Sequence, residues 1–294
     1  MKNKYTLFVI LAGSLWGFMG FFRRTLDSIG LSAMGVIAVR CLFALILFGV
    51  LMLATDREAF KIKMKDLWVF VGCGVLSLLV FGWCYFKAMD HMSLSTAAIL
   101  LYTAPCFVIL MSVPLFKEKL TARKLVAMAL AFVGCCLVSG IGSGDGHITL
   151  VGLMLGLGSG LCYALYSIFS RFAINRGYST YTINFYSCLL ASIGALIIDG
   201  PQCFSLTFAS GTNLFYAAAT GLVTCFLPYM LYTKGLLGLE NGKASIMASI
   251  EPVVATLVGF VIYNENPTVM SLAGIVFVLS AIVLLNIKSK KAEH

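Results

Sequence analysis

Glu251 is the acidic residue of this 294-residue sequence that lies nearest the middle of a long apolar segment. The segment begins near Lys243, eight residues earlier, so a helix would place the carboxylate ~12 Å from that end. A carboxylate that deep in an apolar environment is costly unless it faces a polar interior or a water-filled cavity. The following Pro252 cannot donate a backbone hydrogen bond, which leaves a carbonyl free one turn earlier. A carboxylate beside free carbonyls suits binding of a cation, an ammonium group or a proton.

Two roles are open for Glu251. The carboxylate either binds a ligand or a coupling proton, or it stays protonated and joins a neighbouring helix through a structural hydrogen bond.

Arg40 is the basic counterpart, placed about seven residues into another apolar segment and therefore ~10 Å from its nearer end. Its planar guanidinium suits bidentate binding of a carboxylate. That carboxylate is either Glu251, if the two segments adjoin, or an acidic group of a ligand. The alternative is that the long side chain extends to the membrane surface and binds neither.

Trp16, Tyr85 and Tyr102 are the aromatic candidates, because they offer apolar faces with polar tips, as a small-molecule site requires. Packing is the alternative for each of them, since 13% of all residues are aromatic. Pro105 and Pro252 are predicted to interrupt helices. The sequence thus offers seven candidate residues for one interior site.

The elements that must position these residues are membrane-spanning helices. Hydrophobic residues make up 60% of the chain and charged residues only 11%, against about 25% charged in soluble domains. Stretches of about 20 apolar residues, which cross a bilayer as helices, give ten predicted spans. These are 5–26, 33–54, 67–89, 95–115, 122–140, 149–172, 180–199, 212–234, 243–263 and 269–287. We therefore predict an all-α polytopic membrane protein with ten transmembrane helices.

The net charge of +9 reflects membrane topology. If the N-terminus is cytoplasmic, nearly all Lys and Arg residues fall in cytoplasmic segments, which is the positive-inside pattern. We expect a multi-pass protein of the cell inner or plasma membrane with both termini cytoplasmic. The lipid bilayer, and no nucleic acid, is then the partner of the basic chain.

The two halves of the chain resemble each other at an offset of 147 residues. Arg24 matches Arg171, Pro105 matches Pro252 and Glu118 matches Glu265, whereas Glu251 matches Ala104. Five spans per half is an odd number, so the second half (148–294) must be inverted relative to the first (1–147). Inverted repeats supply two related conformations, each open to one side of the membrane.

The sequence contains no pattern typical of a metal site, a nucleotide site or a catalytic site. The 10 cysteines are scattered with no Cys-x-x-Cys, so we expect no metal site. No nucleotide-binding Gly-x-x-x-x-Gly-Lys-Ser/Thr motif is present, and His91, His147 and His294 lie far apart in the sequence. The predicted loops are too short for a catalytic domain. We expect neither an enzyme nor a cofactor.

The second half contains Ala244 to Ala255, with a small-residue helix around the Glu251–Pro252 pair, and then Tyr263-Asn264-Glu265. Together with the weaker copy in the first half, Trp16-Gly17 and Arg40, this resembles the EamA-type branch of the drug/metabolite transporter superfamily. The resemblance covers essentially the whole chain. It implies ten helices, a central cavity surrounded by spans 1, 3, 4, 6, 8 and 9, and export of amino acids or related metabolites. The asparagine before Glu265 departs from the small residue that is usual there.

The function that we predict is secondary transport of a small-molecule substrate by alternating access. Export of amino acids or related compounds is favoured. An importer or exchanger of a charged metabolite, or a membrane receptor or scaffold without flux, are the alternatives. Assembly as a homodimer stays open.

Overall fold

The computed structural model describes residues 2–140 and 149–287, which form helices joined by short connections. The α-helices are α1 (Lys2–Trp16), α2 (Met19–Ser28), α3 (Ala33–Thr55), α4 (Leu67–Val71), α5 (Phe81–Met89), α6 (Leu94–Leu101), α7 (Ala104–Phe116), α8 (Ala122–Val138), α9 (Leu150–Asn175), α10 (Thr180–Asp199), α11 (Gln202–Thr207), α12 (Gly211–Thr220), α13 (Leu227–Leu236), α14 (Asn241–Ala248), α15 (Glu251–Tyr263) and α16 (Val269–Asn286). Two 3₁₀ turns, η1 (Arg57–Phe60) and η2 (Met64–Asp66), and two π-helical segments, η3 (Gly72–Val80) and η4 (Gly221–Phe226), complete the elements. His147, His294 and the predicted boundary between the halves lie outside the described residues.

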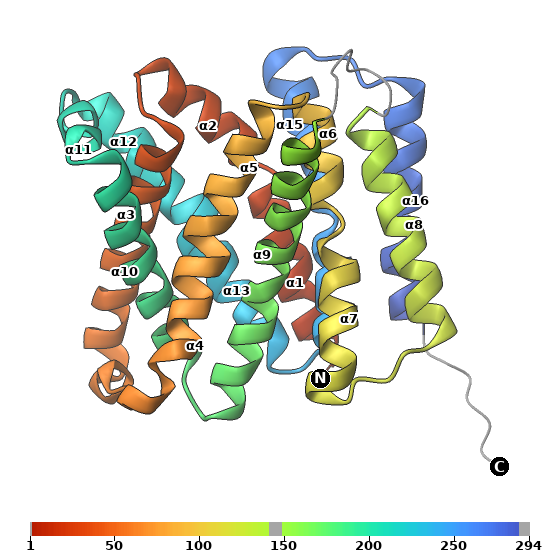
Figure 1. Cartoon of the computed structure of the whole chain (residues 1–294), viewed down its shortest axis with the longest axis horizontal. Coiled ribbons are helices and arrows are strands. Elements are labelled where there is room, and N and C mark those ends of the chain that lie inside the picture. The colour runs from red at the N-terminus through yellow and green to blue at the C-terminus, as the bar shows by residue number, and fades with distance from the viewer. Residues whose placement is uncertain (1, 141–148, 288–294) are drawn as a thin grey trace.

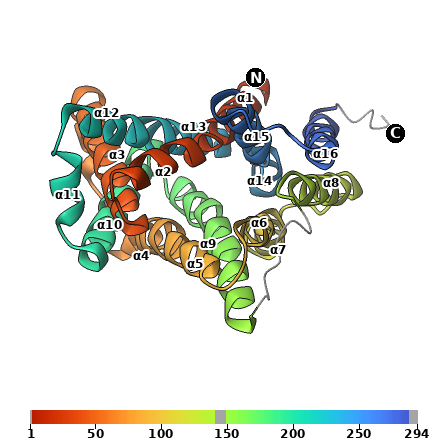
Figure 2. The ribbon, with the colours of Figure 1, turned by 90° about the horizontal axis from the view of Figure 1, so that it is seen from above.

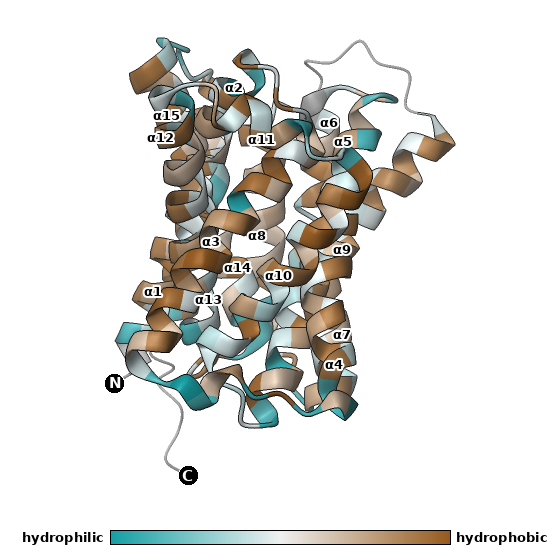
Figure 3. Cartoon of the chain, turned by 90° about the vertical axis from the view of Figure 1, so that its left-hand side faces the viewer, coloured by the Kyte–Doolittle hydropathy of each residue, from teal (hydrophilic) through white to brown (hydrophobic). Residues whose placement is uncertain are grey.

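Nine helical stretches within residues 2–140 and 149–287 are long and apolar enough to cross a membrane. The remaining predicted span, 122–140, corresponds to α8. Its 17 residues pack along α16 at one side of the bundle (Figure 1). Apolar residues dominate the middle of the helices and polar residues gather toward both ends (Figure 3). The predicted all-α membrane architecture is thereby confirmed.

Several spans are built from more than one helix. The fourth span divides into α6 and α7, and the ninth divides into α14 and α15. Pro105 and Pro252 lie in the first turn of α7 and α15, where a residue without a backbone N–H is tolerated because no intrahelical bond is required there. The two prolines therefore mark helix starts directly after the breaks, as expected from the sequence. A break between α1 and α2, after Trp16, was not predicted.

The helices repeat at the offset seen in the sequence. Helices α3 and α10, α6 and α14, α7 and α15, and α8 and α16 each begin 147 residues apart. Even the helix ends agree, because Lys117 and Asn264 both end their helices in the left-handed conformation, with φ of 54° and 55°. The repeat-related helices α1 and α9 run in opposite directions (Figure 1). The second half thus has the inverted arrangement predicted for an odd number of spans.

Close helix contacts bring the two halves together at the broken spans. A Cβ atom on Gly13 of α1 would lie 2.7 Å from the backbone oxygen of Ala248, at the end of α14. Only glycine allows this approach, so α1 is held against the break between α14 and α15. Viewed from above, α11 lies at one rim of the molecule and α16 lies toward the opposite side (Figure 2).

The bundle has two ends, called the lower edge and the upper edge. The lower edge is the end at which α1 begins and α7 ends, and the upper edge is the end at which α6 begins and α15 ends (Figure 1).

Candidate functional site

Glu251 is the first residue of α15 and directly follows the break in the ninth span. Its side chain is partly exposed, and one carboxylate oxygen accepts a hydrogen bond from the Tyr163 hydroxyl at 3.3 Å. The start of a helix carries a partial positive charge, which favours an ionised carboxylate at this position. The helix break therefore gives this acidic side chain a polar environment although it lies inside a membrane span.

A small cavity of about 10 Å³ adjoins this carboxylate. Its lining comes from both halves of the chain: Leu101, Tyr102, Ala104, Pro105, Tyr163, Ser245, Ala248, Ser249 and Glu251. This volume is about that needed by the centre of one water molecule, far below the several hundred Å³ of a typical small-molecule site. A metabolite would need the surrounding helices to move apart.

Two helix breaks, one from each half, line the cavity. One set of lining residues comes from the end of α6 and the start of α7, and another comes from the end of α14 and the start of α15. Helix starts present amide donors to anions, and helix ends present carbonyl oxygens to cations. This arrangement can bind a small molecule that carries both charges, as in carriers whose broken helices meet near the membrane midplane.

Tyr163 was not among the candidates from the sequence, although it matches Trp16 at the repeat offset. The two rings contact each other edge to face with centroids 6.0 Å apart. Trp16 is buried and also contacts Tyr229 and Tyr232, with centroid distances of 5.2 and 5.4 Å. These rings line a second cavity of about 10 Å³, which shares Tyr163 with the first. Tyr163 thus connects Trp16 to Glu251.

The other two aromatic candidates lie differently. Tyr102 lines the cavity beside Glu251. Tyr85 lines neither cavity described above and stacks on Phe81, with centroids 6.1 Å apart. Phe81 in turn contacts Tyr163 at 5.5 Å. Tyr85 therefore lies one layer behind the site.

Arg40 is buried and does not pair with Glu251 among the ion pairs and hydrogen bonds of the described residues. Its terminal nitrogen donates to the Met19 sulfur at 3.4 Å, and its Nε has no partner. The side chain stays inside the bundle and does not extend to the membrane surface. A buried guanidinium with an unused donor is costly, which makes a transient anionic partner favourable.

Three cysteine thiols form a cluster near Arg40. The sulfur atoms of Cys41, Cys188 and Cys225 lie within 4.8 Å of one another, and Cys41 and Cys188 occupy matching repeat positions. Three thiols at this spacing are a soft ligand set that could hold a metal ion. Sequence reasoning did not predict the cluster, because its members come from three helical segments far apart in the chain. Buried cysteines also pack as small apolar residues, and that role explains their position in the core.

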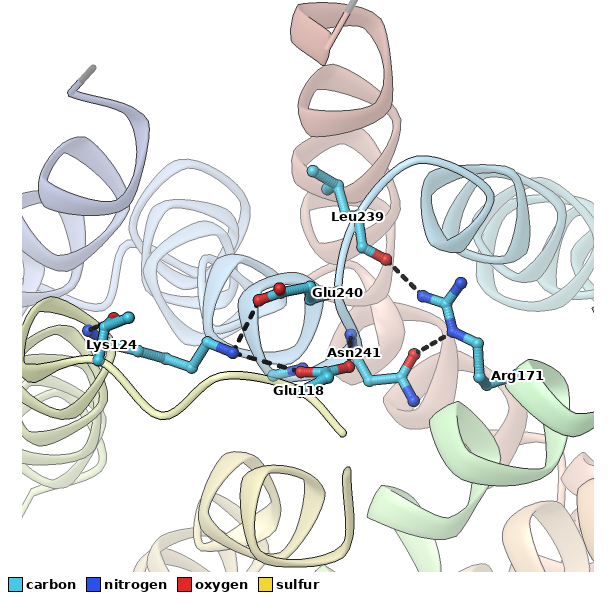
Figure 4. Close-up of polar contacts among 8 residues, drawn as sticks. Glu118, Lys124, Arg171, Leu239, Glu240 and Asn241 are labelled. Atoms are coloured by element: carbon cyan, nitrogen blue, oxygen red, sulfur yellow. Dashed lines mark hydrogen bonds and ion pairs between the residues drawn. The ribbon is translucent and has the colours of Figure 1, made fainter. Parts of the chain in front are cut away.

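A buried polar network closes the lower edge (Figure 4). Glu118 accepts hydrogen bonds from the backbone N–H groups of Asn241, at 2.6 Å, and Gly242, at 3.2 Å. Lys124 forms ion pairs with Glu118, at 3.3 Å, and with Glu240, at 2.8 Å. Arg171 donates to the Asn241 side chain and to the Leu239 carbonyl. The contacts of this network join the segment that follows α7 to the start of α14, across the two halves.

At the upper edge the repeat mates make a simpler contact. Arg24 and Glu265 form an ion pair at 2.8 Å, and both side chains are more than half exposed. The guanidinium of Arg24 also lies over the Tyr263 ring, 4.4 Å from its centroid.

The chain matches a known protein family. The EamA-like transporter family matches it twice, over residues 3–140 and 150–287. The chain belongs to the EamA-like transporter family. The two matches correspond to the two halves of this EamA-like chain, and the resemblance inferred from its sequence is confirmed.

Relatives with similar sequences are also described as transporters. The uncharacterized transporter YxxF of Bacillus subtilis is 27% identical over 96% of the EamA-like chain and 89% of its own length. An uncharacterized transporter of Archaeoglobus fulgidus is 30% identical over 71% of the chain and 75% of its own length. A solved crystal structure superposes with a TM-score of 0.82 over 97% of both chains at 16% identity, which shows the shared fold. This EamA-like protein is therefore an integral membrane transporter of a small molecule.

Proposed function

We propose that this EamA-like protein is a secondary transporter of amino acids or related small metabolites that works by alternating access, with export as the preferred direction. The observation that supports this function best is the position of Glu251. It lies at the break of one span and shares a cavity with the broken span of the other half. The family resemblance suggests export, and the positive-inside pattern of basic residues suggests that the lower edge is cytoplasmic.

The geometry around Glu251 favours a zwitterionic substrate. Its carboxylate and the carbonyl end of α14 suit an ammonium group. The positive end of the α7 helix dipole, where Ala104 and Pro105 line the same cavity, favours a carboxylate. Tyr102 and Ala248 leave an apolar side to the cavity. A small amino acid carries both charges and an apolar part.

Glu251 also suits coupling to protons. Within the described residues its carboxylate accepts a single hydrogen bond from a side chain, that of Tyr163. The ion pairs found within residues 2–140 and 149–287 do not include Glu251. A carboxylate with so little compensation can bind either a proton or the substrate ammonium group, and exchange of the two would couple their movements. Catalysis plays no part in this proposal.

The test is flux into and out of proteoliposomes with a labelled panel of amino acids, polyamines and carboxylates. Saturable flux of amino acids, accelerated by a pH gradient and lost in Glu251→Gln, is the expected result. We expect a loss of at least about a hundredfold, because a charge-assisted contact to the substrate is worth about 3 kcal/mol. The matched control is Glu58→Gln, an exposed carboxylate that pairs with Lys61 and lines neither cavity, which should leave gradient acceleration in place.

Each other outcome removes a part of the proposal. Flux that ignores the pH gradient would make the protein a facilitator or exchanger. Undiminished flux in Glu251→Gln would leave the carboxyl with a structural role. Binding of a panel member without any movement would contradict transport of it and favour a receptor.

A further inference from the structure

The broken spans of the two halves pack against each other at one end of the bundle. At the lower edge, α7 packs against α14. The repeat mates of these helices are α15 and α6, and within the described residues this pair forms no comparable contact at the upper edge. The halves do meet at the upper edge through α9, which packs against α5 and α6. The two edges therefore differ in how the broken spans meet.

Glu118 is the polar centre of the closed end. Its carboxylate, 7% exposed, accepts from the first two backbone N–H groups of α14. These N–H groups have no acceptor within their own helix, so a carboxylate there satisfies them and the positive helix start together. Because Glu118 belongs to the first half and α14 to the second, this contact holds the halves together.

The repeat provides a second copy of both partners at the upper edge. The mate of Glu118 is Glu265, and the mates of Asn241 and Gly242 are Leu94 and Ser95, the first two residues of α6. The residues before these helices, Ser93 and Glu240, have the same extended conformation. Glu265 follows a left-handed residue just as Glu118 does. The backbone needed for the same contact is therefore present, but Glu265 is 53% exposed and pairs with Arg24.

We propose that Glu118 and Glu265 are paired gate residues that exchange roles during transport. In the conformation open at the lower edge, Glu118 leaves the start of α14. Glu265 then leaves Arg24 and accepts hydrogen bonds from the backbone N–H groups of Leu94 and Ser95. This inference rests on alternating access in the proposed function, but not on the identity of the substrate.

Hydrogen–deuterium exchange of the full chain in proteoliposomes tests this exchange of roles without any substrate. Peptides that cover the starts of α14 and α6 report the two edges separately. In Glu118→Gln, exchange at Asn241 and Gly242 should rise by about tenfold or more, because two bonds to a carboxylate are weakened. Exchange at Leu94 and Ser95 should fall in the same sample, because the upper edge closes.

The reciprocal variant keeps the proposal testable if Glu118→Gln does not fold. Glu265→Gln replaces an exposed side chain and should fold normally. It should lower exchange at Asn241 and Gly242 below the level of the native chain. The conformation closed at the upper edge loses the contact made by Glu265 and is populated less. The control is Glu58→Gln, an exposed residue paired with Lys61, which should change neither peptide.

Opposite changes at the two edges in the two variants would support the gate. A rise at both edges in Glu118→Gln would show plain destabilisation and would overturn the proposal. So would a Glu265→Gln variant that leaves both peptides unchanged. If the gate fails while proton-coupled amino-acid flux is measured, the proposed function stands and only the gate is lost. If the gate responds as expected and no flux is found, the reverse holds.

Discussion

The lower and upper edges of the molecule have nearly the same backbone and different electrostatics. Below, Glu118 and Lys124 are 7% and 6% exposed and pair with each other, and Glu118 also accepts hydrogen bonds from the start of α14. Above, Glu265 and Arg24 are 53% and 55% exposed and mainly contact each other. Exposed ion pairs contribute about 0–1 kcal/mol, whereas removing one partner of a buried pair costs about 3–5 kcal/mol. A repeated fold can therefore carry a strong contact at one end and a weak one at the other.

The largest expected effect breaks the buried side of this comparison. Lys124→Met removes the cation that is paired with Glu118 and leaves that carboxylate buried with less compensation. The free energy of unfolding should fall by about 3 kcal/mol. Arg24→Met, the matched change at the upper edge, should cost less than about 1 kcal/mol because its partner is exposed. Thermal unfolding in detergent measures both, and equal losses would show that burial does not distinguish the edges.

A medium effect tests the site that lies between the edges. Tyr163→Phe keeps the ring contact with Trp16 and removes the hydrogen bond to Glu251. Transport should fall by about fivefold, since one such bond contributes about 1 kcal/mol. The readout is flux of the amino acid found in the panel. Tyr186→Phe is the control, because its hydroxyl donates to the Phe60 carbonyl, away from both cavities. Equal flux in Tyr163→Phe and the native chain would remove Tyr163 from the mechanism.

The smallest expected effect is the change that salt makes to the ion pairs at the two edges. Raising the ionic strength from about 0.1 M to about 1 M shortens the screening length from about 10 Å to about 3 Å. The small stability difference between the native chain and Arg24→Met should then vanish, since that pair is solvated. The difference caused by Lys124→Met should persist, since Lys124 is buried. Unfolding at the two salt concentrations measures this, and a Lys124→Met difference that also vanished would place its ion pairs in solvent.

The sequence predicted the features that depend on local chemistry and on the repeat. The apolar stretches predicted the spans, and proline predicted the starts of α7 and α15 after the breaks. The depth of Glu251 indicated a candidate site, which stays a prediction; Tyr102 and Pro105 line the cavity beside Glu251. The spans could be predicted because helix length and proline geometry act over one or two turns.

The contacts between distant spans could not be predicted. Glu118 and Asn241 are 123 residues apart, and nothing local indicates that a carboxylate meets that helix start. Arg40 was considered as a partner for Glu251, yet its guanidinium contacts Met19. Tyr163 was visible only as the mate of Trp16. Such contacts depend on how helices rotate and pack, which one sequence does not specify.

The π-helical segments η3 and η4 make the length of their spans as important as their composition. A π turn accommodates an additional residue relative to an α-helix. Deleting one residue within Gly221–Phe226 would therefore let the segment return to α-helical winding while the residues beyond it keep nearly the same orientation. Tyr229 and Tyr232 would still contact Trp16. A one-residue deletion in the regular helix α12 would instead rotate everything beyond it by about 100° and turn both tyrosines away from Trp16. In this span, a deletion should be tolerated better in the π-helical segment than in the α-helix before it.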